Sequence, residues 1–255
     1  MKLFFRNISK NTTVTKNLII LHGLFGSGDN WLTIARRFSE NFNIYLPDLR
    51  NHGQSPHNNI HDYDSMAEDL HEFFIDNKIE RASLIGHSMG GKASMKFAFE
   101  YPEMVEKLIV VDIAPREYQT SNKYIVEMLL KIDLKMIKTR EQADELLSQK
   151  IANKPIRQFI LKNLFRNDDM SFSWKLNLKA LSENLSSMGG FNNGNKFEKE
   201  TLFIRGENSN YIKDSDYKLI YDTFPKGKIE TIENAGHWLH TENPERTYHI
   251  IKDFL

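Results

Sequence analysis

A serine between two glycines is the residue best suited to do chemistry in this sequence. It lies in the pentapeptide Gly86-His87-Ser88-Met89-Gly90, which follows the apolar run 82–85 and opens a segment with helical spacing. This context fits a strand-turn-helix elbow, whose turn is so sharp that a Cβ two residues before or after the serine would collide with backbone. Such a pentapeptide also occurs by chance in glycine-containing turns, but its position after a strand favours Ser88 as a nucleophile.

A serine hydroxyl is a poor nucleophile at neutral pH, so it needs a base that a third group orients. Among nine histidines, His237 is the best candidate. It lies in a glycine-containing loop between the apolar run 229–232 and the last helical segment, and loops at the carboxyl ends of parallel strands are where such folds bind ligands. His240 is the nearest competitor, and we expect it to be structural.

The acid is harder to place. In folds with such an elbow the chain order is serine, acid, histidine, and the acid commonly follows a strand that comes after an inserted helical lid. The loop after the late apolar run 202–204 has Ser209 where an aspartate is expected. Asp112 ends the preceding strand at the same rim as Ser88, so we favour Asp112 as the acid, with Ser209 as a hydrogen-bonding fourth member. Asp112 could instead be a buried carboxylate that accepts backbone amides at a strand end. The fallback acids are Glu207, Asp214 and Asp216.

A developing oxyanion needs backbone donors aimed at it. Met89, directly after the nucleophile, is expected to supply one. The other is expected from the turn after His22-Gly23, from Leu24 first and from Phe25 next, while His22 packs under that turn. The glycines of this turn do not have the spacing of a phosphate-binding loop, and no lysine follows. The side chains expected to contact the substrate are Phe25, His87 and Trp238.

A second polar cluster occupies residues 48–55, directly after a predicted strand. We interpret it as a structural network of arginine and aspartate beneath the site. The alternative is a metal site, for which the residue types are suitable but the spacings match no metal motif. Its ligands would be Asp48, His52, His57 and His61. We expect no metal and no cofactor.

The order of elements predicts an α/β fold with a doubly wound, mostly parallel sheet. Short apolar runs, typical of strands buried on both faces, alternate with segments of helical spacing. The runs are 18–21, 44–46, 82–85, 108–111, 202–204 and 229–232, and the clearest helical segments are 64–77 and 89–101. Asn243 followed by Pro244 predicts the N-terminus of a last helix that extends to about residue 254.

Between residues 115 and 195 the strand-like runs disappear and amphipathic helical stretches take over. Thr139 and Gln142 have the spacing of a capping box, and two apolar stripes follow. The stripes are Ala143, Leu146, Leu147 and Ile151, then Trp174, Leu178, Leu181 and Leu185. Glycine and asparagine at 189–190 and 192–194 then return the chain to the sheet. We therefore expect a helical lid at 115–195, inserted into a core domain of residues 1–114 and 196–255.

The composition excludes several classes of function. The 255 residues include 34 basic and 34 acidic ones, so the chain has no net positive charge that would attract nucleic acid or an anionic membrane. The chain has no cysteine, so disulfides and thiol chemistry are excluded. Neither a signal peptide nor a membrane-spanning run is evident. We expect a cytoplasmic protein with a small-molecule substrate and neither a nucleic-acid nor a membrane partner; its oligomeric state is left open.

The motifs together resemble the α/β-hydrolase superfamily along nearly the whole chain and, within it, the YbfF-type esterases. They are found at residues 22–27, 48–53, 86–91, 111–115 and 235–238. The asparagine at position 51 and the Asp-Ile-Ala-Pro run at 112–115 point to this subgroup. The resemblance implies hydrolysis of carboxylic esters through an acyl-enzyme, with Ser88 as nucleophile, His237 as base, Asp112 as acid and Ser209 assisting.

Three hypotheses about function follow. The first is a serine esterase, or a thioesterase, that acts on short to medium acyl groups. The second is a carbon-carbon bond lyase or hydrolase on the same triad, like the menaquinone-pathway lyases, although basic lid residues for a polyanionic substrate cannot be located. The third is a non-catalytic binding module that kept the fold, since fold alone does not imply function. Acyl preference depends on how lid residues close over the pocket, among them Tyr124, Met128, Phe159 and Trp174.

Overall fold

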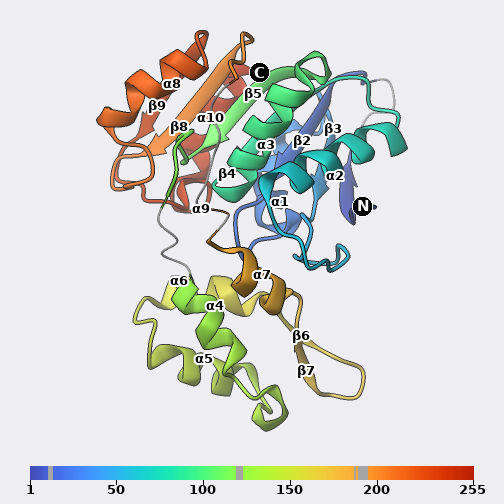
Figure 1. The fold of residues 1–255 in the computed structure, drawn as a ribbon, viewed down its shortest axis with the longest axis vertical. Helices are drawn as coiled ribbons and strands as arrows, with labels where there is room; N and C mark the ends of the chain where they lie inside the picture. The colour runs from blue at the N-terminus through green and yellow to red at the C-terminus, as the bar shows by residue number, and fades with distance from the viewer. Residues whose placement is uncertain (11–13, 119–122, 187, 189–194) are drawn as a thin grey trace.

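The main element of the protein is a seven-stranded sheet, shown in Figure 1. The computed structural model describes residues 1–10, 14–118, 123–186, 188 and 195–255. In spatial order the strands are β1 (Phe5–Ile8), β3 (Asn43–Pro47), β2 (Asn17–Leu21), β4 (Ala82–His87), β5 (Val105–Val111), β8 (Thr201–Gly206) and β9 (Gly227–Ile232). β1 pairs antiparallel with β3, and the other neighbouring strands pair in parallel. The predicted α/β class is therefore confirmed.

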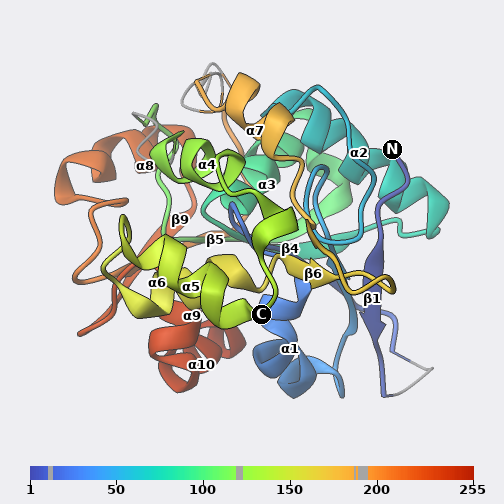
Figure 2. The same ribbon diagram turned by 90° about the horizontal axis from the view of Figure 1, so that it is seen from below.

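Helices cover both faces of this sheet, as Figure 2 shows. One face packs against α2 (Tyr63–Asp76), α3 (Met89–Glu100) and α8 (Tyr217–Thr223). The other face packs against α1 (Leu32–Phe38), α9 (Leu239–Glu242) and α10 (Pro244–Phe254). Because both faces are buried, the inner strands are mostly apolar, and their polar residues lie near the strand ends. Short 3₁₀ turns connect these elements at Gly28–Trp31, Pro102–Met104 and Asp214–Asp216.

Between β5 and β8 the chain leaves the sheet and forms a separate helical layer beyond the carboxyl ends of the strands (Figure 1). We call residues 123–184 the cap. Its elements are α4 (Lys123–Leu130), a 3₁₀ turn (Leu134–Met136), α5 (Arg140–Ser148), α6 (Lys154–Leu161), β6 (Leu164–Arg166), β7 (Phe172–Trp174) and α7 (Leu178–Asn184). The cap has its own hydrophobic cluster, which also takes in Phe25 of the core. The wider limits expected for the lid from the sequence, residues 115 and 195, stay a prediction.

Two expectations about the cap are wrong. Strand-like runs were expected to disappear there, but β6 and β7 form a two-stranded antiparallel sheet. Consequently Trp174 lies in a strand rather than on the second helical stripe. Leu146 is exposed, whereas the other members of the first stripe are buried.

Several local patterns are confirmed. Thr139 and Gln142 form the capping box of α5, and Asn243 caps α10 by accepting the backbone N–H of Arg246, with Pro244 in the first turn. The predicted helices begin and end within one residue of α2 and α3. The predicted turn residues at 189–190 and 192–194 lie outside the described residues.

Candidate active site

Ser88 lies where β4 ends and α3 begins, with a φ of 52°. A positive φ is uncommon for a residue with a side chain and indicates a strained turn. The two glycines permit it: a Cβ at Gly86 would lie 2.3 Å from the carbonyl oxygen of Gly90, and one at Gly90 would lie 2.5 Å from that of His22. The strand-turn-helix elbow is therefore present, and it holds Ser88 at the carboxyl end of the sheet.

His237 lies between Ser88 and Asp112. Its Nε2 is 3.1 Å from Ser88 Oγ, and its Nδ1 is 2.7 Å from Asp112 Oδ2. With the ring proton on Nδ1, the histidine donates to the carboxylate and directs the Nε2 lone pair at the hydroxyl. In this arrangement a histidine can accept the proton of a serine.

Asp112 is fully buried directly after β5, where its φ is 52°. Its Oδ1 accepts the backbone N–H of Gly206 at 3.2 Å, and the Ser209 hydroxyl donates to Oδ2, the oxygen that also faces His237. The carboxylate thus accepts a backbone amide, as in the alternative interpretation, and contacts the histidine as well. Ser209 lies in the position that the sequence suggested for it.

The fallback groups have other partners. Glu207 accepts a backbone N–H of the His237 loop, whereas Asp214 and Asp216 each pair with an arginine. In the described part of the chain, none of these carboxylates bonds to the His237 ring. His240 stacks on Trp31 with ring centroids 4.4 Å apart, and burial lowers its pKa to about 3. His240 is therefore a neutral, packed ring.

The turn after β2 orients the backbone of Leu24. The carbonyl oxygen of Gly23 accepts the N–H of Gly26 at 2.9 Å and faces His22 Nδ1 at 2.8 Å. The C=O and N–H of a trans peptide point in opposite directions, so these bonds turn the Leu24 N–H away from His22. Among the described residues, the backbone N–H groups of Leu24 and Met89 have no hydrogen-bond partner. Both are available to an oxyanion.

The expectation that Phe25 is the next oxyanion donor is wrong. Its N–H donates to His52 Nε2 at 3.2 Å. Burial lowers the pKa of His52 to about 3, so the ring is neutral and carries one proton. That proton lies on Nδ1, which donates to the carbonyl oxygen of Arg50 at 3.0 Å, so Nε2 accepts the bond from Phe25. The Phe25 ring lies elsewhere, in the wall of the pocket.

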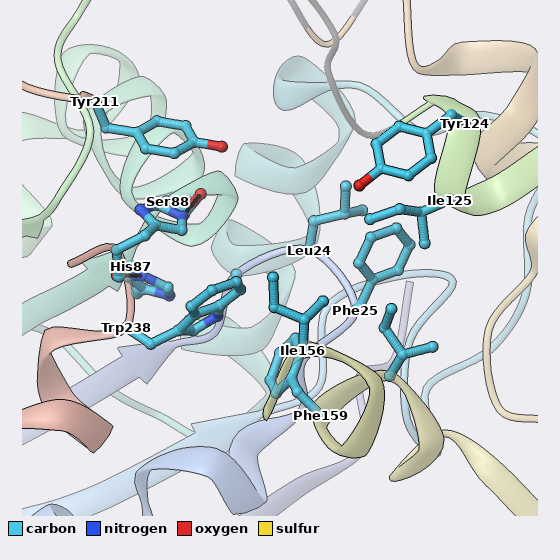
Figure 3. A pocket seen from close by; sticks show the side chains of 13 residues that line it. Leu24, Phe25, His87, Ser88, Tyr124, Ile125, Ile156, Phe159, Tyr211 and Trp238 are labelled. Carbon is cyan, nitrogen blue, oxygen red and sulfur yellow. Dashed lines mark hydrogen bonds between the residues drawn. The ribbon is translucent and has the colours of Figure 1, made fainter. Parts of the chain in front are cut away.

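A cavity of about 270 Å³ lies beside Ser88, between the sheet and the cap (Figure 3). From the core it is lined by Gly23, Leu24, Phe25, His87, Ser88, Tyr211, His237 and Trp238. From the cap it is lined by Tyr124, Ile125, Ile156, Phe159 and Ile160. The three expected substrate contacts are all in this wall. Most of the lining is apolar, so the cavity suits a hydrocarbon chain better than a charged group.

Two of the lid residues named from the sequence do not line the cavity. Tyr124 and Phe159 do, whereas Met128 and Trp174 pack against the hydrophobic cluster of the cap. The direction of these side chains depends on how the cap folds, which their residue types and spacing do not determine.

Tyr211 is a residue of this site that was not predicted from the sequence. Its ring stacks on His237, with centroids 3.9 Å apart and planes 18° apart, and its N–H donates to Ser209 Oγ at 3.2 Å. Tyr211 therefore packs against one face of the His237 ring. The signal available in the sequence was its place two residues after Ser209.

His87, next to the nucleophile in the elbow, holds the backbone of the His237 loop. Its Nε2 donates to the carbonyl oxygen of His237 at 2.9 Å. Burial lowers the pKa of His87 well below its usual value, so the ring is neutral. Although His87 touches the cavity, its hydrogen bond serves the backbone of His237.

The polar cluster at 48–55 is a structural network in this fold. Asp48 accepts the backbone N–H groups of Gly28 at 2.7 Å and Gln54 at 2.8 Å, and Arg50 pairs with Asp69 at 2.6 Å. Within the described ranges, no group of three or more acidic or histidine side chains could hold a metal ion. No helix among the described residues is long and apolar enough to cross a membrane.

Comparisons with known proteins agree with this geometry. The family model of the alpha/beta hydrolase fold matches residues 16–244. The "sn-1-specific diacylglycerol lipase ABHD11" of Danio rerio is 36% identical over 236 residues, covering 89% of this chain and 74% of that protein. "Esterase YbfF" of Escherichia coli is 32% identical over 257 residues, covering 100% of this chain and 99% of that protein.

A solved structure described as "Marine microorganism esterase" is 42% identical, with a TM-score of 0.94 and 100% of both chains covered. The resemblance to YbfF-type esterases is therefore confirmed. The chain belongs to the α/β-hydrolase family and, like these esterases, is a carboxylic ester hydrolase.

Proposed function

We propose that Ser88, His237 and Asp112 form a catalytic triad that hydrolyses carboxylic esters through an acyl-enzyme. The observation that carries this proposal is the hydrogen-bonded line from Ser88 Oγ through the His237 ring to Asp112 Oδ2, at the wall of an apolar cavity. This line supplies a nucleophile, its base and the group that orients the base.

The reaction has two halves. His237 Nε2 takes the proton of Ser88 while Oγ attacks the ester carbonyl, and the N–H groups of Leu24 and Met89 stabilise the oxyanion. The protonated His237 then gives its proton to the leaving alcohol, which departs and leaves the acyl group on Ser88. Water, deprotonated by His237, then attacks this acyl group. The bond from the acyl carbon to Ser88 Oγ breaks as His237 returns the proton to Oγ, and the acid is released. Each oxyanion donor typically contributes about 3 kcal/mol to the transition state.

The cavity favours short to medium acyl chains. Its volume of about 270 Å³ is slightly below the range of about 300–1,000 Å³ that is typical of ligand pockets. Ester and thioester carbonyls fit the same chemistry, and the diacylglycerol named for the Danio rerio relative is a further ester to test. A cytoplasmic location stays a prediction from the sequence.

The first experiment measures initial hydrolysis rates on p-nitrophenyl esters from acetate to laurate, with a diacylglycerol and an acyl thioester as added substrates. The wild type should prefer chains shorter than laurate. Ser88→Ala should lower kcat by several orders of magnitude, because the attacking oxygen is gone. Retained turnover in that variant would reject the mechanism.

The lyase hypothesis finds no support in the cavity, because its described lining includes no lysine or arginine for a polyanionic substrate. The binding-module hypothesis does not explain why nucleophile, base, acid and oxyanion donors lie together. Faster turnover of a polyanionic carbon-carbon substrate than of any ester would reverse this order.

A further inference from the structure

The turn that carries Leu24 is held at Phe25 from two sides. His52 of the core accepts the N–H of Phe25 at 3.2 Å, and Asn163 of the cap donates from Nδ2 to the carbonyl oxygen of Phe25 at 2.8 Å. The two bonds fix the peptide groups before and after Phe25, and so fix both of its backbone angles. Its φ is 63°, in the left-handed region that a bulky residue rarely adopts. The turn therefore depends on outside contacts to keep this conformation.

Asn163 is itself well positioned within the cap. It lies between α6 and β6, is 3% exposed, and its Nδ2 also donates to the carbonyl oxygen of Ile160 at 3.1 Å. Its main-chain carbonyl oxygen accepts the N–H of Lys175 at 2.9 Å, which ties its backbone to the cap. Because Nδ2 donates both to Ile160 of the cap and to Phe25, a shift of the cap would move the donor that holds the Phe25 carbonyl.

The Phe25 ring adds a second link between the turn and the cap. It belongs to the hydrophobic cluster of the cap, and Figure 3 shows it between Leu24 and the side chains of α4 and α6. Seating of the cap and the conformation of the turn thus involve the same residue. Leu24, whose N–H is a proposed oxyanion donor, directly precedes it.

We propose that Asn163 is a positioning residue that makes the oxyanion-binding geometry of Leu24 depend on the seated cap. The proposal rests on the function proposed above. Asn163 does not touch the reacting atoms; it acts through the backbone of Phe25. The loss of its side chain should impair the transition state more than the binding of the ester.

Asn184 provides a matched control. Its Nδ2 donates to the carbonyl oxygen of Asn59 at 2.8 Å, so it also joins the cap to the core, but at a site remote in sequence from the turn. If Asn163 only helped to hold the cap, Asn163→Ala and Asn184→Ala would have similar effects on catalysis.

The test compares wild type, Asn163→Ala and Asn184→Ala on the best p-nitrophenyl ester, together with the affinity for phenylboronic acid, which forms a tetrahedral adduct on an activated serine. For Asn163→Ala we expect kcat to fall about 10- to 100-fold, as for other small displacements near reacting groups, with KM within about threefold. Affinity for phenylboronic acid should fall by a similar factor. Asn184→Ala should keep kcat within about twofold, while both variants lose thermal stability.

Equal kcat values for the two variants, or a change in KM alone, would overturn the proposal. If Asn163→Ala does not fold, Asn163→Asp keeps the shape but places a carboxylate against two carbonyl oxygens; only its protonated form can donate. Its activity relative to wild type should therefore rise as the pH falls, and a constant ratio would overturn the proposal. A wild type without ester turnover would instead reject the proposed function, so the two failures are distinguishable.

Discussion

At the scale of single residues, the Asp112 carboxylate is the best-anchored group of the site. One oxygen accepts from Gly206, and the other accepts from both His237 and Ser209. Its main-chain N–H donates to the carbonyl oxygen of Ile204 at 2.8 Å, which ties it to the neighbouring strand. The carboxylate cannot rotate without breaking several bonds, so the plane of the His237 ring is fixed with it.

This anchoring predicts unequal effects for the two partners of His237. Asp112→Asn should lower kcat by about 10³- to 10⁴-fold, because an amide N–H facing Nδ1 favours the wrong tautomer. Ser209→Ala removes only one of the bonds that orient the carboxylate, so a fall of about tenfold is expected, as for one hydrogen bond to a charged group. Steady-state kinetics of both variants checks this.

The exposed fallback acid Asp214 is the matched control, and Asp214→Asn should keep kcat within about twofold. The assignment would be wrong if Asp214→Asn lost as much activity as Asp112→Asn.

The sequence was sufficient to identify residues whose role follows from local spacing, and insufficient where the role depends on a distant partner. Ser88, His237 and Asp112 each follow a predicted strand, and parallel strands bring their carboxyl ends to one rim. Phe25 was misjudged because the group that occupies its N–H, His52, comes from another loop. The stacking of Tyr211 on His237 is a contact through space, which its place two residues after Ser209 does not by itself indicate.

At the scale of elements, the short helix α9 organises the His237 loop. The Glu242 carboxylate accepts the backbone N–H of Gly236 and, at 3.3 Å, that of Trp238, which are the neighbours of the histidine on either side. The loop is thus held from α9 by Glu242 and from the elbow by His87.

We therefore expect Glu242→Ala to lower kcat by about three- to tenfold, since the base becomes less well positioned while the pocket is unchanged. Glu245, three residues further on, is also exposed and pairs with Arg37, so Glu245→Ala serves as the control and should leave kcat unchanged. Equal kcat values for the two variants, measured on the same ester, would contradict this role for Glu242.

The strands that the sequence did not indicate are the shortest ones. β1 has four residues and lies at the sheet edge, while β6 and β7 have three residues each. Strands this short cover barely one period of side-chain alternation, and they form because a partner strand supplies their hydrogen bonds. The inner strands, by contrast, contain the apolar runs typical of strands buried on both faces, and each was predicted within a few residues of its bounds.

At the scale of the whole molecule, five histidines of the described residues are buried: His22, His52, His61, His87 and His240. Burial lowers the pKa of His22 to about 4 and those of His52 and His240 to about 3, and it lowers the pKa of His61 and His87 well below the usual value. In the unfolded chain these groups titrate near pH 6.5. Between these pKa values the unfolded chain binds more protons, so stability rises with pH and is lost as the pH falls below about 6.5.

We expect the free energy of unfolding to fall steeply between pH 7 and pH 5. Each histidine contributes a slope of up to about 1.4 kcal/mol per pH unit, so several together can remove the roughly 5–15 kcal/mol that stabilises a domain. Urea unfolding at a series of pH values measures this, and equal stability at pH 7 and pH 5 would contradict it.

His240→Phe tests one of these groups. A phenylalanine can keep the stacking on Trp31 without taking up a proton on unfolding, so the slope should become shallower by about one proton. His57, which is exposed, is the control, and His57→Ala should leave the slope as it is in the wild type.

The most direct test of the central mechanism is to find which residue an alkyl fluorophosphonate labels, by peptide mass spectrometry of the folded protein. Such reagents phosphonylate a serine only when its base and oxyanion donors are in place. One label per chain, on Ser88, absent in Ser88→Ala and much slower to form in His237→Ala, is the predicted result. Ester hydrolysis without a label on Ser88, or a label on another residue, would contradict the triad proposed here.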